Sequence, residues 1–253
     1  MKLKGLAAVV TGGASGLGRA TAEALSHAGA RVAVIDVNER SAREVADSIG
    51  GLAVGCDITD SAALQTALET AESTLRGIRV CVNCAGIGPA KRILGRDGPM
   101  RLEEFSRVIS VNLVAAFDVM RLVSAQMAKL DPLESGERGV LIHTASIAAY
   151  EGQVGQTAYS ASKGGVASLV LPAARELARH GIRVLAIAPG VFSTPMLHAL
   201  PPEVQQSLAA ATPFPKRVGR PSEYAALAMH MIENEMLNGE VIRLDGGIRL
   251  SAS

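Results

Sequence analysis

Residues 6–25 read LAAVVTGGASGLGRATAEAL, and they carry the strongest indication of the fold. It opens with a short apolar run typical of a β-strand, passes through a glycine-rich turn and ends in a helical pattern. Gly12, Gly16 and Gly18 fall in the turn, where glycine permits positive φ and a close approach of the backbone to a phosphate. The start of a helix adds free N–H groups and a positive dipole end. The stretch therefore predicts a strand–turn–helix unit that binds the pyrophosphate of a dinucleotide.

The next apolar run, RVAVID, ends in Asp36, eighteen residues after Gly18. A carboxylate at this point of a dinucleotide-binding unit can accept hydrogen bonds from both ribose hydroxyls, and it repels a 2′-phosphate. Asp36 thus predicts NAD as the cofactor in preference to NADP. The alternative is that Asp36 is a surface charge at the end of a strand.

The rest of the chain alternates short apolar runs with helical patterns. Strands are predicted over 6–11, 31–36, 52–56, 79–83, 139–145, 182–188 and 240–244, and helices over 17–28, 39–48, 61–76, 103–129, 157–180, 203–210 and 222–233. This alternation predicts one doubly wound Rossmann-type α/β domain over 1–253, with a seven-stranded, mainly parallel sheet and helices on both faces.

Two segments break this rhythm. Residues 91–102 are rich in glycine and charge, and residues 190–221 are rich in proline. Because the second segment follows the carboxyl end of a strand, it is placed to form a lid over the ligand crevice. A loop with one short surface helix fits the same sequence.

A candidate catalytic group lies in the second half of the chain. Tyr159 and Lys163 are four residues apart in TAYSASKGG, and Ser146 comes thirteen residues before the tyrosine. Four residues are about one helical turn, so the phenol and the ammonium share a helix face. A nearby ammonium favours the phenolate and lowers its pKa from about 10, and a serine at the preceding strand end can bind the same substrate oxygen. The alternative is a Tyr/Lys pair on a solvated helix face.

These motifs together resemble the short-chain dehydrogenase/reductase family over nearly the whole chain. TGGASGLG (11–18), NCAG (83–86), Asn112, the Ser/Tyr/Lys group and Pro189-Gly190 with Thr194 occur in the family's order and spacing. The resemblance implies an NAD-dependent oxidoreductase in which Ser146, Tyr159, Lys163 and Asn112 are catalytic, the asparagine anchoring a water that links Lys163 to solvent. It assigns contacts with the cofactor to Gly12, Ser15, Gly16, Leu17, Gly18, Asp36, Asp57, Ile58, Asn83, Cys84, Ala85, Gly86, Tyr159, Lys163, Pro189, Gly190, Phe192 and Thr194.

A closer resemblance is to family members that act on 3-hydroxyacyl-CoA thioesters and hydroxysteroids. It lies in HTASIAAYEGQVGQTAYSASKGG (143–165), in LNGEVIRLDGG (237–247), in Cys84 and in an extra segment, 91–105. It implies oxidation of a 3-hydroxyacyl-CoA to the 3-oxoacyl-CoA, with a hydroxysteroid or another secondary alcohol as the alternative substrate. Ser146, Gln153 and Tyr159 are the expected substrate contacts.

Other features of the chain leave alternatives open. The basic residues Lys91, Arg92 and Arg96 could meet the phosphates of CoA or could be surface charges. One alternative function is a non-catalytic nucleotide-binding scaffold. Such a protein could lack Ser146, Tyr159 or Lys163, whereas this chain has all three. The family further implies a homotetramer that forms through the helices 103–129 and 157–180 and the C-terminal strand.

Composition limits the partners and the compartment. Net charge is +1, with 48% hydrophobic and 19% charged residues, so no electrostatic case exists for nucleic acid or anionic membranes. The apolar run after Lys4 is too short for a signal peptide, and we expect no run to reach membrane-spanning length. We expect a cytoplasmic protein.

Cys81 and Cys84 form C-x-x-C, but in a strand they point to opposite faces, so a structural role is favoured over a metal or redox site.

Overall fold

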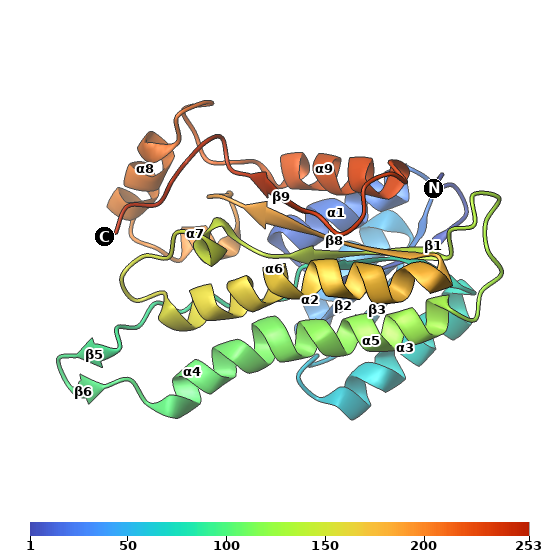
Figure 1. Ribbon diagram of the computed structural model, residues 1–253, viewed down its shortest axis with the longest axis horizontal. Coiled ribbons are helices and arrows are strands. Elements are labelled where there is room, and N and C mark those ends of the chain that lie inside the picture. The colour runs from blue at the N-terminus through green and yellow to red at the C-terminus, as the bar shows by residue number, and fades with distance from the viewer. Residues whose placement is uncertain (253) are drawn as a thin grey trace.

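The computed structural model describes residues 1–252 and contains a seven-stranded sheet between two layers of helices (Figure 1). The strand order is β3-β2-β1-β4-β7-β8-β9, and all neighbouring strands run parallel. This confirms the predicted doubly wound Rossmann-type α/β fold. The strands are β1 (Ala7–Thr11), β2 (Arg31–Asp36), β3 (Leu52–Gly55), β4 (Ile78–Asn83), β7 (Gly139–Thr144), β8 (Ile182–Pro189) and β9 (Val241–Leu244).

The sheet is buried on both faces, which is why its strands are continuous apolar runs. In β1, Val9 belongs to the core on one face and Val10 to the core on the other. The helices of one layer are α1 (Gly16–His27), α2 (Glu39–Ile49) and α9 (Pro221–Glu233). Those of the other layer are α3 (Ser61–Leu75), α5 (Ala115–Met127) and α6 (Thr157–Leu177).

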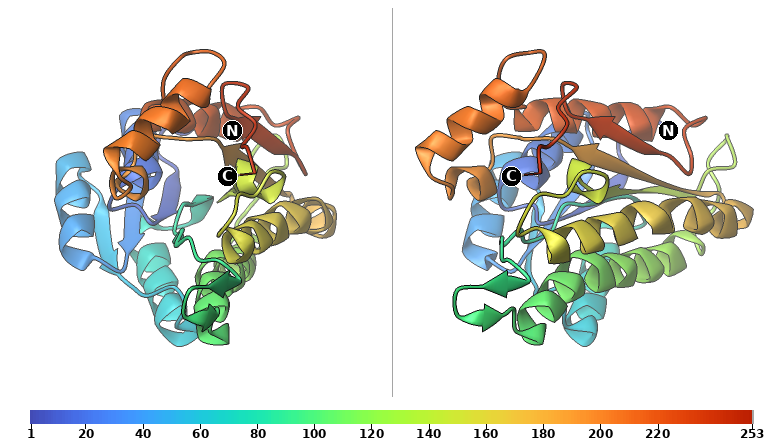
Figure 2. Two further views of the ribbon diagram at one scale, coloured as in Figure 1. Left: turned by 90° about the vertical axis from the view of Figure 1, so that its left-hand side faces the viewer. Right: turned by 60° about the vertical axis from the view of Figure 1, so that its left-hand side comes forward.

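The two irregular segments contain short elements, of which the sequence pattern predicted only the helix over 203–210. A hairpin of β5 (Leu94–Gly95) and β6 (Gly98–Pro99) lies within the first. The second contains α7 (Pro195–His198) and α8 (Pro202–Ala211). Figures 1 and 2 show the hairpin and α8 standing off the body of the molecule, at the end where the strands of the sheet terminate. Every residue of α8 is at least partly exposed, as expected of a segment that covers a cavity.

One long helical stretch runs from α4 (Leu102–Ile109) through a π-helical turn (Ser110–Val114) into α5. Contrary to the expectation from sequence, this stretch of 26 residues is long and apolar enough to span a membrane by length and composition. Half of its apolar window is buried inside the fold, and Val119, Val123 and Met127 belong to the core against the sheet. Packing within the fold therefore accounts for its apolarity.

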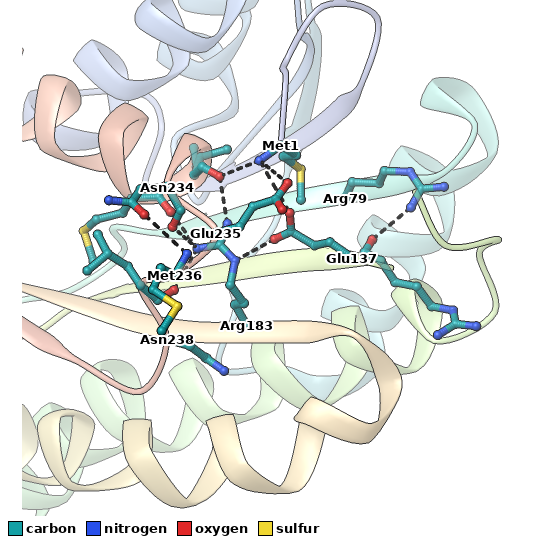
Figure 3. A network of polar contacts seen from close by, with 12 residues as sticks. Met1, Arg79, Glu137, Arg183, Asn234, Glu235, Met236 and Asn238 are labelled. Carbon is teal, nitrogen blue, oxygen red and sulfur yellow. Dashed lines mark hydrogen bonds and ion pairs between the residues drawn. The ribbon is translucent and has the colours of Figure 1, made fainter. Parts of the chain in front are cut away.

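A buried ion pair between Glu137, just before β7, and Arg183, at the start of β8, lies beside the end of α9 (Figure 3). Arg183 Nε donates to Glu137 Oε1 at 2.7 Å, and both side chains are almost fully buried. The remaining guanidinium N–H groups donate, at 2.7 to 3.2 Å, to the main-chain oxygens of Met231, Ile232, Asn234 and Leu237. Carbonyls at the end of a helix lack partners within that helix and carry its negative dipole end, so Arg183 satisfies and neutralises the end of α9.

Replacing Arg183 by Met is expected to lower the free energy of unfolding by about 3–5 kcal/mol, because the buried Glu137 carboxylate keeps only the Met1 ammonium, 3.5 Å away, and several carbonyls at the end of α9 lose their donor. Urea unfolding measures this. The matched control is Arg43→Met, which removes an exposed ion pair with Glu39 and should cost under about 1 kcal/mol. Equal losses in the two variants would contradict the stabilising role of Arg183.

Candidate active site

A cavity of about 1430 Å³ lies at the carboxyl ends of the strands. Its walls come from the β1–α1 turn, from the segments after β2, β3, β4, β7 and β8, from α6, α7 and α8, and from the C-terminal segment Ile248–Ser251. Carboxyl ends of strands, where the strand order reverses about β1, are where open α/β sheets bind ligands. The cavity is therefore the candidate active site.

The glycine turn forms one wall, and all five residues predicted from it line the cavity: Gly12, Ser15, Gly16, Leu17 and Gly18. Gly12 has φ of +64°, and a Cβ there would lie 2.6 Å from the main-chain nitrogen of Ala85. A Cβ at Gly18 would collide with the main-chain oxygen of Gly12. These two glycines let the start of α1 come to the cavity surface, which suits a pyrophosphate at the helix N-terminus.

Two carboxylates continue this wall. Asp36, at the end of β2, accepts hydrogen bonds from the main-chain N–H of Ala14 at 3.1 Å and of Asn38 at 3.0 Å. Asp57 accepts from the main-chain N–H and the hydroxyl of Thr59, and these bonds lower the pKa of its carboxyl. Both line the cavity, as does Ile58. Backbone contacts thus hold Asp36 in place beside the glycine turn, where a ribose is expected.

The NCAG stretch (83–86), which begins with the last residue of β4, differs from the prediction at that residue. Cys84, Ala85 and Gly86 line the cavity, whereas Asn83 lies behind the wall. The side-chain oxygen of Asn83 accepts a hydrogen bond from the hydroxyl of Thr11. Asn83 and Thr11 are register partners in β4 and β1, so the asparagine ties the two strands together instead of facing the cavity.

The three central catalytic candidates meet on the opposite wall. Ser146, Tyr159 and Lys163 all line the cavity, the serine from the turn after β7 and the other two from the first turns of α6. Lys163 Nζ lies 5.8 Å from the centroid of the Tyr159 ring. The same ammonium donates to the main-chain oxygen of Thr144 at 2.7 Å. The sequence spacing therefore predicted correctly that these side chains come together.

The electrostatics of this group differ from the expectation that Lys163 lowers the pKa of Tyr159. Burial raises the pKa of the Tyr159 phenol, against a smaller lowering by a hydrogen bond with Ser146. Burial also lowers the pKa of the Lys163 ammonium to about 8. The cause is desolvation: a buried site disfavours the charged form of both groups, and the ammonium bonds a carbonyl oxygen rather than the phenol oxygen.

Asn112 also lies behind the wall, in the π-helical turn between α4 and α5. Its side-chain oxygen accepts from the N–H of Ile87, and its amide donates to the oxygen of Ile87, each at 2.8 Å. The amide also donates to Ser162 Oγ at 3.0 Å. A Cβ on Gly86 would stand 3.2 Å from this asparagine and 3.5 Å from Lys163 Nζ. Asn112 therefore braces the segment after β4 against α6, immediately beside the lysine.

The remaining predicted contacts line the cavity as expected from the resemblance: Pro189, Gly190, Phe192, Thr194 and Gln153. Other lining residues were missed. Arg107, Ser110 and Val111 share one face of the helical stretch that contains α4, a face that helical periodicity could have identified. Leu200 comes from the connection between α7 and α8, and Val204 and Leu208 come from α8, where only the short predicted helix 203–210 pointed to them. The sequence carried no signal for the C-terminal segment.

The basic residues of the 91–105 segment lie outside the cavity lining. Lys91 forms an ion pair with Glu104 at 2.5 Å. Arg92 and Arg96 line a small separate hollow of their own hairpin. The positions of all three therefore favour the surface-charge interpretation over contact with CoA.

The cysteines behave as structural residues. Cys81 lies in the core on one face of the sheet, and Cys84 packs against the core on the other, which confirms the predicted opposite orientation. Burial raises the pKa of the Cys81 thiol to about 12. Within residues 1–252, no group of three or more His, Cys, Asp or Glu side chains is arranged to hold a metal ion.

Comparison with known proteins agrees with this geometry. Residues 6–205 match the family model described as short chain dehydrogenase. The chain belongs to the short-chain dehydrogenase family. It is 50% identical to 3-hydroxyacyl-CoA dehydrogenase type-2 of Homo sapiens, over 98% of this chain and 97% of that protein. It is therefore an enzyme of an oxidoreductase family.

Two solved structures extend the comparison. The crystal structure of 3-hydroxyacyl-CoA dehydrogenase type-2 from Mycobacterium avium is 42% identical and superposes with a TM-score of 0.94, covering 98% of both chains. A 7α-hydroxysteroid dehydrogenase, solved with NADH and 7-oxo glycochenodeoxycholic acid, is 31% identical with a TM-score of 0.89. This second match covers 100% of this chain and 97% of that one.

Replacing Tyr159 by Phe is expected to cut turnover by about 10²–10⁴-fold, the range for loss of a general acid–base group. Dinucleotide affinity should stay close to wild type, because the ring and the Lys163 ammonium remain. Steady-state kinetics and a fluorescence titration with NADH measure the two quantities. Tyr150→Phe, an exposed tyrosine outside the cavity lining, is the matched control. More than about a tenth of wild-type kcat in Tyr159→Phe would exclude Tyr159 as the proton-transfer group.

Proposed function

We propose that this enzyme transfers a hydride between a secondary alcohol and NAD, and that its substrate is a 3-hydroxyacyl-CoA, oxidised to the 3-oxoacyl-CoA. One observation carries the proposal: a single cavity joins the glycine turn and Asp36 to Ser146, Tyr159 and Lys163. Binding and acid–base groups thus face the same space, as hydride transfer between a dinucleotide and an alcohol requires.

The glycine turn fits a dinucleotide, since side chains at Gly12 or Gly18 would fill or distort the surface on which a pyrophosphate rests. The turn would hold the pyrophosphate, Asp36 the adenosine ribose, and Asp57 with Ile58 the adenine. Cys84 to Gly86 would run along its middle, and Pro189, Gly190, Phe192 and Thr194 would flank the nicotinamide. When bound, NAD accepts the hydride from the carbinol carbon.

The chain's own residues handle the proton. Ser146 Oγ would hold the substrate oxygen, and Tyr159, as phenolate, would take the hydroxyl proton while the carbon–hydrogen bond breaks, leaving a ketone. In the reverse direction the same phenol returns the proton to the carbonyl oxygen. Burial raises the phenol pKa, so a phenolate here would need a positive charge nearby, which the Lys163 ammonium, 5.8 Å from the ring centroid, would supply during the reaction. Asn112 would act by positioning this wall and the water that leads from Lys163 to solvent.

The substrate assignment rests on similarity and on the cavity's apolar side. Two relatives with full-length matches are named 3-hydroxyacyl-CoA dehydrogenase type-2. Leu200, Val204 and Leu208 offer apolar surface to an acyl chain, and Gln153 would contact the substrate beside Ser146. The same apolar wall suits a steroid, and the match to 7α-hydroxysteroid dehydrogenase makes a hydroxysteroid the second candidate.

We further propose a cytoplasmic homotetramer that works without nucleic acid or membrane partners. Val114, Phe117 and Leu171 are exposed on the outer sides of the helical stretch 102–127 and of α6, the helices through which the family's tetramers form. Large exposed apolar side chains on neighbouring helices are typical of protein interfaces. Size-exclusion chromatography with light scattering distinguishes a tetramer from a monomer.

NAD should be preferred to NADP by at least about tenfold in kcat/KM, because the Asp36 carboxylate would face the 2′-phosphate and about 1.4 kcal/mol already gives that ratio. Kinetics with both cofactors measure this, and Asp36→Ala should narrow the gap. Glu39→Ala, which removes a nearby exposed carboxylate, should leave the ratio unchanged. Comparable kcat/KM with the two cofactors in the wild type would contradict the assignment of Asp36.

NADH-dependent reduction of acetoacetyl-CoA should exceed reduction of a small β-keto ester and of oxosteroids in kcat/KM. A panel of acyl-CoA chain lengths and steroids measures this. A Lys91/Arg92/Arg96 triple alanine variant should keep its KM for acetoacetyl-CoA within about twofold, since exposed charges outside the site act weakly. A CoA-specific rise in KM would contradict that placement. Activity on steroids alone would overturn the acyl-CoA assignment.

A further inference from the structure

Thr144, the last residue of β7, has hydrogen-bond partners in three other residues around the cavity. Its main-chain oxygen accepts the hydrogen bond from Lys163 Nζ at 2.7 Å. Its hydroxyl donates to the main-chain oxygen of Asn83 at 2.8 Å and lies 2.7 Å from the hydroxyl of Tyr224. A threonine hydroxyl has a single proton. Because that proton is used on Asn83, Tyr224 is the donor to Thr144.

Tyr224 reaches Thr144 from α9, on the other face of the sheet from Lys163 and α6. It is among the largest fully buried side chains. Burial raises the pKa of its phenol far above the usual range, so it remains a protonated donor. Cys84 Sγ donates to the same phenol oxygen at 3.7 Å, and Cys84 lines the cavity. A continuous polar chain thus runs from the cavity wall through Tyr224 to Thr144, inside an otherwise apolar core.

We propose that Tyr224 is a positioning residue for the reaction, fixing through Thr144 the carbonyl oxygen that holds the Lys163 ammonium. The inference rests on the proposed role of Lys163. A lysine side chain is flexible, and its ammonium is directed only by the acceptors around it. β7 ends at Thr144, before the 3-10 turn Ile147–Ala149, so an anchor at this strand end limits how far the carbonyl can move.

The surroundings of Lys163 make this acceptor important. The titratable groups that face the ammonium are Tyr159 on its own helix, Cys84 after β4 and His143 on β7. Burial holds the pKa of His143 at about 4 and raises the pKa of Cys84, so both are neutral near pH 7. The hydrogen bond to the Thr144 oxygen is therefore a direct stabiliser of the charged lysine, whose pKa burial has already lowered to about 8.

The test is Tyr224→Phe, assayed for kcat and for NADH affinity as a function of pH. The variant should lose about three- to tenfold in kcat, the size expected for one neutral hydrogen bond. An ammonium with a looser acceptor loses its proton more easily. Because Lys163 is one of the expected cofactor contacts, loss of its proton should weaken NADH binding. The pH at which half of the NADH affinity is lost should therefore fall by about half a unit.

Three further variants separate positioning from packing. Thr144→Val removes the hydroxyl but keeps the carbonyl and the packing of Tyr224, and should reproduce both effects. The double variant should be little worse than either single one, because the two residues act in one chain. Tyr150→Phe should match wild type. Wild-type pH midpoints in both single variants, even with a lower Tm, would overturn the proposal, as would additive losses in the double variant.

The measurement of NADH affinity tests the role of Tyr224 independently of the proposed substrate. NADH titrations contain no substrate, so their midpoints report on Lys163 whichever alcohol the enzyme oxidises. If wild type reduces no acyl-CoA but the Tyr224 and Thr144 variants shift the midpoint, the substrate assignment fails and the positioning role stands. If acyl-CoA is reduced and the midpoints do not move, the positioning role fails.

Discussion

The close approach of the β1–α1 turn to the neighbouring backbone is the constraint on which the rest of the site depends. A Cβ at Gly12 would enter the backbone after β4, and one at Gly18 would strike Gly12 itself. Because β1 pairs with both β2 and β4, this turn lies at the centre of the sheet's carboxyl edge. Because the turn is compact, Asp36 at the end of β2 and Cys84 to Gly86 after β4 lie on one surface. A dinucleotide can then lie flat along it.

The acid–base group depends on the opposite property, burial. Desolvation raises the pKa of Tyr159 and lowers that of Lys163. The charged form of each group therefore needs nearby polar partners to stabilise it. In such a site the placement of each hydrogen-bond partner has large consequences. The carbonyl of Thr144 and the bracing amide of Asn112 come from different elements. They join the sheet, the π-helical turn and α6 into one support for the lysine.

Much of this was predictable from sequence, for physical reasons. Strands buried on both faces are apolar runs between turns, so all seven strands of the sheet could be placed to within one or two residues. Tyr159 and Lys163 share a helix face by periodicity alone. What the sequence could not give depends on tertiary contacts. The side chain of Asn83 bonds Thr11, the ion pair of Lys91 with Glu104 joins residues thirteen apart, and the desolvation of Tyr159 comes from elements remote in the chain. The β5–β6 hairpin is too short for a periodic signal.

The most direct test of the central claim is a crystal structure of the Tyr159→Phe variant with NADH and acetoacetyl-CoA. We expect the pyrophosphate against Gly12 to Gly18, the adenosine ribose on Asp36, and the 3-oxo oxygen of the ligand within hydrogen-bond distance of Ser146 Oγ. A dinucleotide bound elsewhere, or a ligand carbonyl directed away from Ser146 and residue 159, would contradict it.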